Sequence, residues 1–358
     1  MNAYTKALGI AATPAGKGAL RLHLNENGAG CSPAVLRALQ SLTPELVGAY
    51  PDYGPAVSAI ARAYGVPDDW VLLVNGLDEA VQLLSEAAAT TDRPASFSGV
   101  VLDPAFDMYA VGIAHAGGRV SRVSPRPGFA FSLDDVLGVS ATARLIYLTD
   151  PNNPTGIALT DDAIASIATA RPGAIVFVDE AYADYAGRSF IPTLRANPSR
   201  FANVIVGRTF SKAHGLAGLR IGALIAPPDR LANIEAMTSP FNVNIAAAVA
   251  VEAALADTSW LRSTVDEARA CKDDVYEFCA RVGLTCWRSD ANFVLIRVGE
   301  TAADSAAVVD AMAARGILVR DRSAAAGCLG CIRLTTTLMA HTARALRALE
   351  EILASRTR

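Results

Sequence analysis

Seven short apolar runs, separated by segments with helical patterns, set the strongest limit on how this chain folds. Most of the runs are almost continuous in Val, Ile and Leu and do not alternate with polar residues. Strands of this kind are buried on both faces, which is typical of a mostly parallel sheet covered by helices on both sides. The runs lie at Val71–Val74, Val100–Leu102, Arg119–Val123, Leu145–Leu148, Ile175–Val178, Val204–Val206 and Ile221–Ile225. We predict an α/β fold with a mostly parallel seven-stranded sheet, whose ligand site lies at the carboxyl ends of the strands.

The pattern changes after Pro227, where strands and helices no longer alternate one by one. Two long helical segments precede short strands, another helix, further strands and a last helix, which indicates a smaller α+β domain. The expected helices are 244–256, 259–282, 302–314 and 339–355, and the expected strands are 284–287, 292–297, 317–319 and 331–335. We expect an N-terminal segment (1–44) that joins the small domain, a large domain over 45–240 and the small C-terminal domain over 241–358.

Charge and hydropathy argue against several classes of protein. The 358 residues are 52% hydrophobic and 19% charged, which is ordinary for a globular protein. The net charge of −3 gives no reason to expect nucleic acid or an anionic membrane as a partner. No apolar run reaches the roughly eighteen residues of a transmembrane helix, and the first residues lack the pattern of a signal peptide. We expect a cytoplasmic protein.

The six cysteines favour scattered, reduced thiols over a disulfide framework. Cys328 and Cys331 have the spacing of half a zinc site, but no second pair or His cluster completes it. We therefore expect no metal.

Lys212 is the residue whose chemistry stands out. The chain has four lysines and 28 arginines, so a lysine is kept where an arginine cannot serve. Schiff-base chemistry is one such role, because an ammonium can lose its proton and a guanidinium cannot. Thr209, Ser211 and Arg220, in the same glycine-rich stretch, suit a phosphate. The stretch predicts pyridoxal 5'-phosphate (PLP), with a solvated lysine in a glycine-rich connection as the alternative.

Further polar residues follow the predicted strands. The turn at Gly76, with Leu77 and Asp78, begins a helix whose free backbone N–H groups suit an anion. Asn153 lies in a loop fixed by two prolines and a glycine, and its amide can donate to a phenolate oxygen, whereas an ordinary turn is the alternative.

Asp179 ends a strand between apolar residues, so its carboxylate needs a cationic partner such as a pyridinium nitrogen. A helix N-cap is the alternative role for Asp179. Tyr182 can donate beside Asn153, and Phe106 can stack on a flat cofactor or simply pack in the core.

Arg333 lies within an apolar strand and needs an anionic partner, either a substrate group or a structural salt bridge. Arg320 and Arg322 belong either to the same pocket or to the surface.

Taken together, these strings resemble the aspartate aminotransferase superfamily of fold type I PLP enzymes, and they are most similar to its histidinol-phosphate aminotransferase branch. The resemblance covers nearly the whole chain. The matching stretches are Leu24–Asn27, Tyr50-Pro51, Gly76–Glu79, Pro104–Phe106, Pro151–Gly156, Asp179–Tyr182, Ser211-Lys212, Gly215–Arg220, Pro240–Asn244, Ala291–Phe293, Gly316–Arg320 and Arg333.

The resemblance implies a role for each matching residue. Lys212 would form the internal aldimine and then move a proton, and Asp179 would pair with the ring nitrogen. Asn153 and Tyr182 would bind the phenolic oxygen, and Phe106 would stack on the ring. The phosphate would be held by Leu77, Asp78, Ser211, Arg220 and, from the neighbouring subunit of a homodimer with shared active sites, Tyr50. Arg333 would bind the acidic group of the substrate, with Asn25 nearby, and Arg320 matches a family residue that helps to bind a substrate phosphate.

The departures from the family concern the substrate rather than the chemistry. The family usually has tyrosine where this chain has Phe106, and phenylalanine where it has His214. The Pro-Tyr and Pro-Gly pairs of the family's N-terminal arm, which helps to enclose a phosphorylated substrate, are not visible in residues 1–22. Thr336-Thr337 replaces the usual glycine-containing tail after the arginine strand.

The predicted function is that of a PLP-dependent aminotransferase with ping-pong kinetics, which uses histidinol phosphate as donor and 2-oxoglutarate as acceptor. Two alternatives use nearly the same cofactor residues: an aminotransferase for a different amino acid in a specialised biosynthetic pathway, and a PLP decarboxylase of the threonine-phosphate type. A nicotinamide dehydrogenase would need a Gly-x-Gly-x-x-Gly turn after the first strand, which the sequence lacks. A non-catalytic PLP-binding or regulatory protein is a third alternative, and the presence of Lys212, Asp179 and Arg220 together argues against it.

Overall fold

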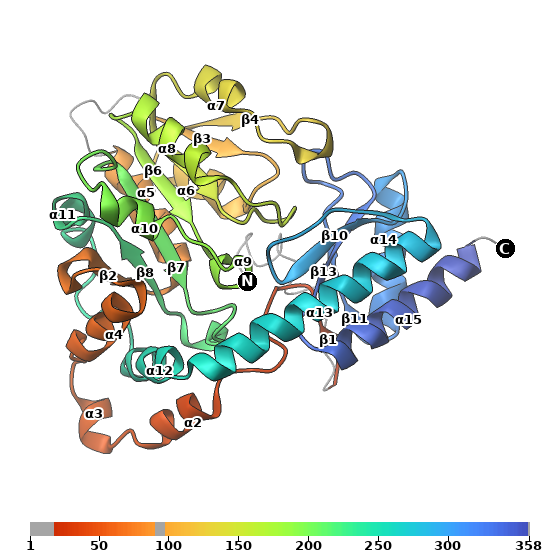
Figure 1. Ribbon diagram of the computed structural model, residues 1–358, viewed down its shortest axis with the longest axis horizontal. Coiled ribbons are helices and arrows are strands. Elements are labelled where there is room, and N and C mark those ends of the chain that lie inside the picture. Colours follow the sequence, from red (N-terminus) through yellow and green to blue (C-terminus); the bar gives the residue numbers. More distant parts are fainter. Residues whose placement is uncertain (1–17, 90–96, 357–358) are drawn as a thin grey trace.

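A seven-stranded sheet forms the centre of the larger part of the molecule (Figure 1). The computed structural model describes residues 18–89 and 97–356. The strand order is β2 (Val71–Val74), β8 (Gly222–Ile225), β7 (Val204–Thr209), β6 (Ile175–Asp179), β5 (Ala143–Thr149), β3 (Ser98–Leu102) and β4 (Arg119–Val123). β8 runs antiparallel to both of its neighbours, β2 and β7, and the other strand pairs of this sheet are parallel. The predicted α/β fold with a mostly parallel seven-stranded sheet is confirmed.

The strands are apolar throughout because both faces of the sheet are covered. Along β6, Val176 and Val178 point to one hydrophobic core, whereas Ile175 and Phe177 point to the other. The first core is closed by α2 (Pro33–Gln40), α4 (Gly54–Tyr64), α7 (Leu133–Val139), α8 (Asp161–Ala170), α10 (Ile191–Ala196) and α12 (Ile245–Ala256). The second is closed by α5 (Gly76–Ala89), α6 (Asp107–His115) and α11 (Pro228–Glu235).

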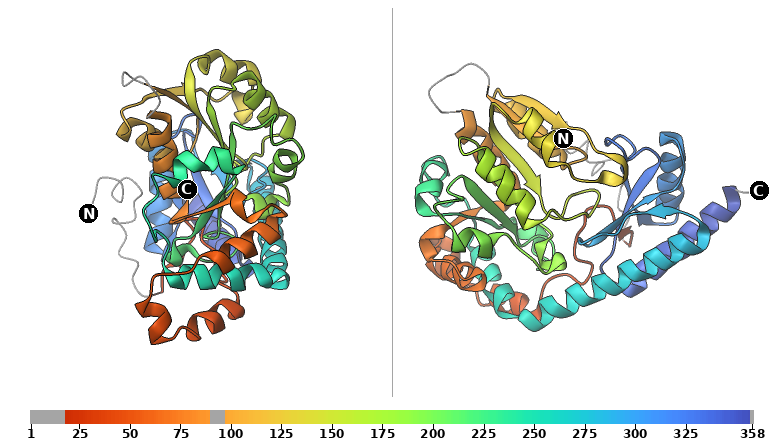
Figure 2. Two further views of the ribbon diagram at one scale, coloured as in Figure 1. Left: turned by 90° about the vertical axis from the view of Figure 1, so that its left-hand side faces the viewer. Right: turned by 45° about the horizontal axis from the view of Figure 1, so that its top comes forward.

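The smaller α+β part holds a four-stranded antiparallel sheet in the order β12 (Arg320–Asp321), β13 (Cys331–Thr335), β10 (Phe293–Arg297) and β9 (Thr285–Cys286). The hydrophobic core of this part also contains side chains from α13 (Thr258–Val282), α14 (Ala302–Ala314) and α15 (Met339–Arg356). The long helix α13 extends from the large part along the small one (Figure 2). Near the N-terminus, β1 (Leu20–Arg21) pairs in parallel with β11 (Ile317–Leu318). The expected domain limits after residues 44 and 240 remain a prediction.

Two features of the fold differ from the expected elements. The expected strand 317–319 corresponds to β11, which pairs with β1, and a further strand that was not expected, β12, follows it and pairs with β13 in the other sheet. Four helices were not expected: α3 (Pro44–Gly48), α7, α9 (Ala183–Ala186) and α11. They have four to eight residues, too few to show a clear helical period in the sequence. Among the described residues, no helix has the length and apolar character needed to cross a membrane.

Candidate active site

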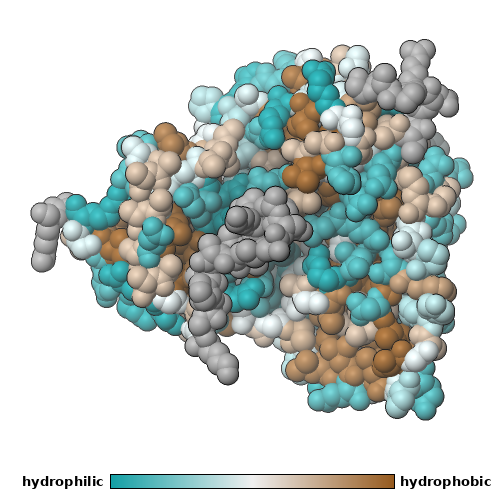
Figure 3. All heavy atoms as spheres, turned by 180° about the vertical axis from the view of Figure 1, so that it is seen from behind, coloured by the Kyte–Doolittle hydropathy of each residue, from teal (hydrophilic) through white to brown (hydrophobic). Residues whose placement is uncertain are grey.

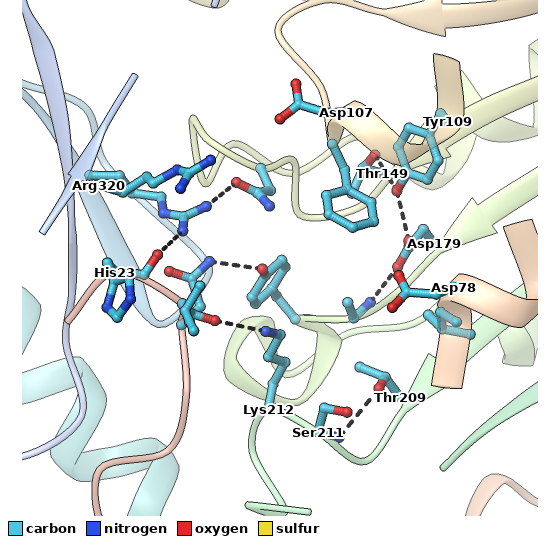
Figure 4. Close-up of a pocket in the computed structure, with 18 of the residues that line it drawn as sticks. His23, Asp78, Asp107, Tyr109, Thr149, Asp179, Thr209, Ser211, Lys212 and Arg320 are labelled. Atoms are coloured by element: carbon cyan, nitrogen blue, oxygen red, sulfur yellow. Dashed lines mark hydrogen bonds between the residues drawn. The ribbon is translucent and has the colours of Figure 1, made fainter. Parts of the chain in front are cut away.

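A cavity between the two sheets gathers nearly all of the residues singled out in the sequence (Figure 4). Its lining includes Asn25, Leu77, Asp78, Phe106, Asn153, Asp179, Tyr182, Ser211, Lys212, Arg220, Arg320 and Arg333. Sheet register explains the grouping, since Thr149 pairs with Asp179 and Asp179 pairs with Gly207, so that β5, β6 and β7 end at one edge. Tyr50 lies outside this cavity, with 79% of its surface exposed and its ring stacked on Phe241.

One end of the cavity is a cradle for a phosphate. Helix α5 begins at Gly76 in a left-handed conformation (φ 73°), and a Cβ there would collide with the Arg220 guanidinium. Arg220 donates to Ser211 Oγ (3.3 Å) and to Asp78 Oδ2 (3.2 Å). The N–H groups of the first turn of α5, a hydroxyl and a guanidinium therefore converge on one point, as a phosphate monoester requires. These residues fit the phosphate of PLP.

Asp179 is a carboxylate buried without a counter-ion. It is 5% exposed, its Oδ2 accepts a hydrogen bond from the Tyr109 hydroxyl (2.7 Å), and its Oδ1 accepts one from the backbone N–H of Ala181 (3.0 Å). Burial raises the pKa of Asp179 to about 6, and no basic group of the described residues offsets this. The alternative role as a helix N-cap is not realised, because α9 begins after Tyr182. A pyridinium nitrogen at this position would supply the missing cation.

Lys212 lies on the other side of the cavity from Asp179 (Figure 4). Its Nζ donates to the carbonyl oxygen of Leu24 (2.9 Å), and no carboxylate of the described residues pairs with it. Burial, together with the charges of Arg333 and Arg220, lowers the pKa of Lys212 to about 8. This amine therefore gives up its proton far more readily than a solvated lysine, which is what bond formation with an aldehyde requires.

Two hydrogen-bond donors lie between these ends. Tyr182 is buried, and its hydroxyl oxygen accepts from Asn25 Nδ2 (2.9 Å), so the hydroxyl hydrogen is free to be donated. Asn153 accepts from Arg333 Nη1 at its Oδ1 (2.5 Å), so its N–H groups remain to be donated. Both side chains suit a phenolate oxygen.

Arg333 gives the remaining side of the cavity its positive charge. It is 6% exposed and donates to the carbonyl oxygen of His23 (2.7 Å), while its Nε has no partner among the described residues. Burial lowers the pKa of Arg333 to about 9. The alternative of a structural salt bridge is not realised among the described residues, so Arg333 is prepared for an anion from outside the chain. Arg320 and Arg322 line the same side, which places both in the pocket rather than on an unrelated surface.

Four lining residues with polar side chains were given no role in the sequence analysis: His23, Asp107, Tyr109 and Thr149. Tyr109 donates to Asp179 and accepts from Thr149 Oγ1 (3.0 Å), so it is linked directly to the buried carboxylate. Its position three residues after Phe106 is a weak signal, because such a spacing brings two side chains to one side of a helix. Burial lowers the pKa of His23 to about 4, so this imidazole is neutral beside the arginines.

Comparison with known proteins identifies the chain's relatives. Residues 18–350 match the family model described as "Aminotransferase class I and II". Histidinol-phosphate aminotransferase 2 of Ralstonia nicotianae is 35% identical over 94% of this chain and 89% of its own length. Histidinol-phosphate aminotransferase 1 of Cupriavidus pinatubonensis is 35% identical over 85% of this chain and 80% of its own. The crystal structure of histidinol-phosphate aminotransferase from Sinorhizobium meliloti, in complex with PLP, superposes with a TM-score of 0.87, at 26% identity over 99% of this chain and 96% of that one.

Tyr109→Phe tests the support of Asp179. The variant keeps the ring stacked on Tyr147 (4.5 Å between centroids) and loses the hydroxyl that stabilises the carboxylate. We expect kcat to fall about tenfold, as loss of a hydrogen bond to a charged group implies. Since the lost donor had favoured the ionised form, the pKa of Asp179 rises, and the acid limb of the pH–rate profile moves to higher pH.

Tyr147→Phe is the matched control, because the Tyr147 hydroxyl bonds to Val81 and Ser85 and not to Asp179. An acid limb that stays in place in Tyr109→Phe, or moves equally in both variants, would contradict the assignment.

The low pKa of Lys212 predicts how the protein takes up its cofactor. Only a neutral amine adds to an aldehyde, so covalent reconstitution of the apoprotein with PLP should accelerate as pH rises through about 8 and then level off. The visible absorbance of the bound cofactor measures the rate. A rate that keeps rising toward the ordinary lysine value of 10.5 would mean that the site does not lower the pKa of Lys212.

Proposed function

Because the chain belongs to the class I and II aminotransferases and is a PLP-dependent enzyme, we propose that its amino donor is histidinol phosphate and its acceptor 2-oxoglutarate. One observation supports this donor above all: the buried Arg333, without an acidic partner among the described residues, faces the cavity together with Arg320 and Arg322. Such a concentration of guanidinium groups suits a phosphate ester better than a neutral or singly charged group. The names of the relatives agree with it.

The proposed roles follow from the contacts of each residue. Leu77, Asp78, Ser211 and Arg220 hold the cofactor phosphate at the start of α5. Asp179, supported by Tyr109, keeps the ring nitrogen protonated. Asn153 and Tyr182 donate to the phenolic oxygen, and Phe106 covers one face of the ring. Arg333 and Arg320, with Asn25 nearby, orient the substrate.

Bound PLP supplies an electron sink for the carbon from which the donor loses its proton. Lys212 is the group that moves this proton, from the donor's amine-bearing carbon to the reacting carbon of the cofactor, and it is able to do so near neutral pH because burial has lowered its pKa. In the second half of a ping-pong cycle the same residues act in reverse, with a carboxylate of 2-oxoglutarate at Arg333. Because the His23 imidazole is neutral, it adds no positive charge to the side of the cavity that the arginines line.

A homodimer with shared sites is part of the proposal. Tyr50 is exposed and lies outside the cavity of its own chain, as expected of a residue that serves the phosphate of a neighbour. Large apolar side chains are exposed close to it along the chain and beside its ring, at Leu36, Leu46, Val47 and Phe241. Figure 3 shows an apolar area at its lower right, at the corner where α2, α3 and α4 lie. We propose that a second copy of the chain covers this surface. We also propose that the enzyme is cytoplasmic.

The two alternative functions share the cofactor residues and differ in what happens to the donor. An aminotransferase for another amino acid would bind a donor that has no phosphate group to place beside Arg320, Arg322 and Arg333. A decarboxylase of the threonine-phosphate type would break a bond to a carboxylate and release CO2 in place of transferring the amino group. The products of the first half-reaction therefore distinguish all three.

A donor test decides among them. The PLP enzyme is mixed with histidinol phosphate, free histidinol, O-phosphothreonine or glutamate in turn, without acceptor, and the bound cofactor is followed by absorbance while the products are identified. We expect rapid conversion of the cofactor to its amino form by histidinol phosphate, and at least about a hundredfold lower kcat/KM for histidinol, since a charged ligand group bound by several guanidiniums is lost. Equal rates for histidinol and its phosphate, or CO2 from O-phosphothreonine, would contradict the proposed donor.

Tyr50→Phe tests the shared site. We expect the dimer to persist in light scattering, because the ring and its stacking on Phe241 remain, while the dissociation constant of PLP rises about tenfold through loss of one hydrogen bond to a charged group. A protein that is monomeric, or a variant with unchanged PLP affinity, would contradict a site completed by a neighbouring Tyr50.

A further inference from the structure

Three carboxylates line the cavity, and two of them already have a place in the cofactor site. Asp78 pairs with Arg220 at the phosphate cradle, and Asp179 is bound by Tyr109 at the ring end. The third, Asp107, has no place in the cofactor site, and its carboxylate lies 3.7 Å from the guanidinium of Arg322. A carboxylate is out of place where an anion is to be bound, so its presence calls for a reason.

Asp107 is the first residue of α6 and directly follows Phe106. Its side chain is 60% exposed, and in Figure 4 it lies on the opposite side of the cavity from His23 and Lys212. The residue therefore contacts the cavity from the large part of the molecule, whereas the arginines contact it from the small part.

The contact between Asp107 and the chain itself is weak. Asp107 Oδ2 lies 3.7 Å from Arg322 Nη1, which is beyond hydrogen-bond distance. Arg322 in turn donates to the carbonyl oxygen of Ala105 across 3.4 Å and has a buried Nε without a partner among the described residues. A carboxylate whose purpose was to fix this arginine would be expected to bind it closely, as Asp150 binds Arg188 at 2.7 Å. Asp107 thus keeps most of its capacity to accept hydrogen bonds from a ligand.

We propose that Asp107 is a specificity-determining residue, which accepts a hydrogen bond from a basic N–H group on the side chain of the amino donor. This inference rests on the proposed function, since histidinol phosphate carries such a group, the imidazole ring, beside the amine and the phosphate. Arg333 and Arg320 bind the anionic end of the donor, and Asp107 binds its basic end. The site then selects a donor by opposite charges at its two ends, which neither the arginines nor the cofactor residues achieve alone.

The test compares two donors that share everything except the ring. L-Alaninol phosphate has the amine and the phosphate of histidinol phosphate and a methyl group in place of the imidazolylmethyl group. In the PLP enzyme, kcat/KM is measured for both donors with the wild type and with Asp107→Asn. We expect the selectivity ratio, histidinol phosphate over alaninol phosphate, to fall about tenfold in Asp107→Asn, as the loss of a charge-assisted hydrogen bond implies. Asp266→Asn, which removes an exposed carboxylate paired with Arg269 on α13, is the matched control and should keep the wild-type ratio.

Two results would overturn the inference alone. If Asp107→Asn lowers kcat/KM equally for both donors, the carboxylate only holds Arg322 in place, and if neither value changes, it has no part in binding. A third result points elsewhere: a wild type that converts neither phosphorylated donor, although glutamate converts its cofactor, overturns the proposed function on which the inference rests.

Discussion

The site depends on charged groups that the fold buries without partners. Asp179 at the end of β6 has no cation beside it, and Arg333 on β13 has no carboxylate, within the described residues. Burying an unpaired charge is costly, and a fold retains such groups where a ligand supplies the missing charge. A pyridinium nitrogen would meet the first need, and the anionic end of a substrate would meet the second. The same burial lowers the pKa of Lys212, so one physical effect acts on the residues that we propose for cofactor binding, substrate binding and proton transfer.

Both parts of the molecule are needed to complete this arrangement. The large sheet supplies the cofactor residues at one edge because its parallel strands end there, whereas Arg320 and Arg333 come from the small antiparallel sheet. Hydrogen bonds between lining residues join the parts inside the cavity, from Arg333 to Asn153, from Asn25 to Tyr182 and from Lys212 to the carbonyl oxygen of Leu24. Any relative movement of the two parts would therefore change the substrate site and the cofactor site together, which offers a way to couple substrate binding to catalysis.

The sequence was sufficient for the features that depend on strand ends and glycines. Apolar runs predicted the sheet, polar residues after two of the runs pointed to Asn153 and Asp179, because parallel strands bring their carboxyl ends together, and the scarcity of lysine pointed to Lys212. The contact of Tyr109 with Asp179 was missed, since it depends on how α6 lies against the sheet and not on any local pattern. Asp107 was missed for a similar reason: an aspartate that begins a helix is ordinary, and only the cavity gives it a neighbour such as Arg322. The short helices α3, α7, α9 and α11 were not predicted, because four to eight residues are too few to show a helical period in the sequence.

The central claim is that Lys212 is the lysine that binds the cofactor, and the chain allows a direct test because it has four lysines in all. The measurement is to reduce the PLP enzyme with borohydride, which makes the bond between lysine and cofactor permanent, and to locate the added mass by peptide mapping. The account predicts the label on Lys212, whose Nζ lies in the cavity. A label on Lys272, which is also buried but donates to the carbonyl oxygen of Ser289 in the small part, would contradict it.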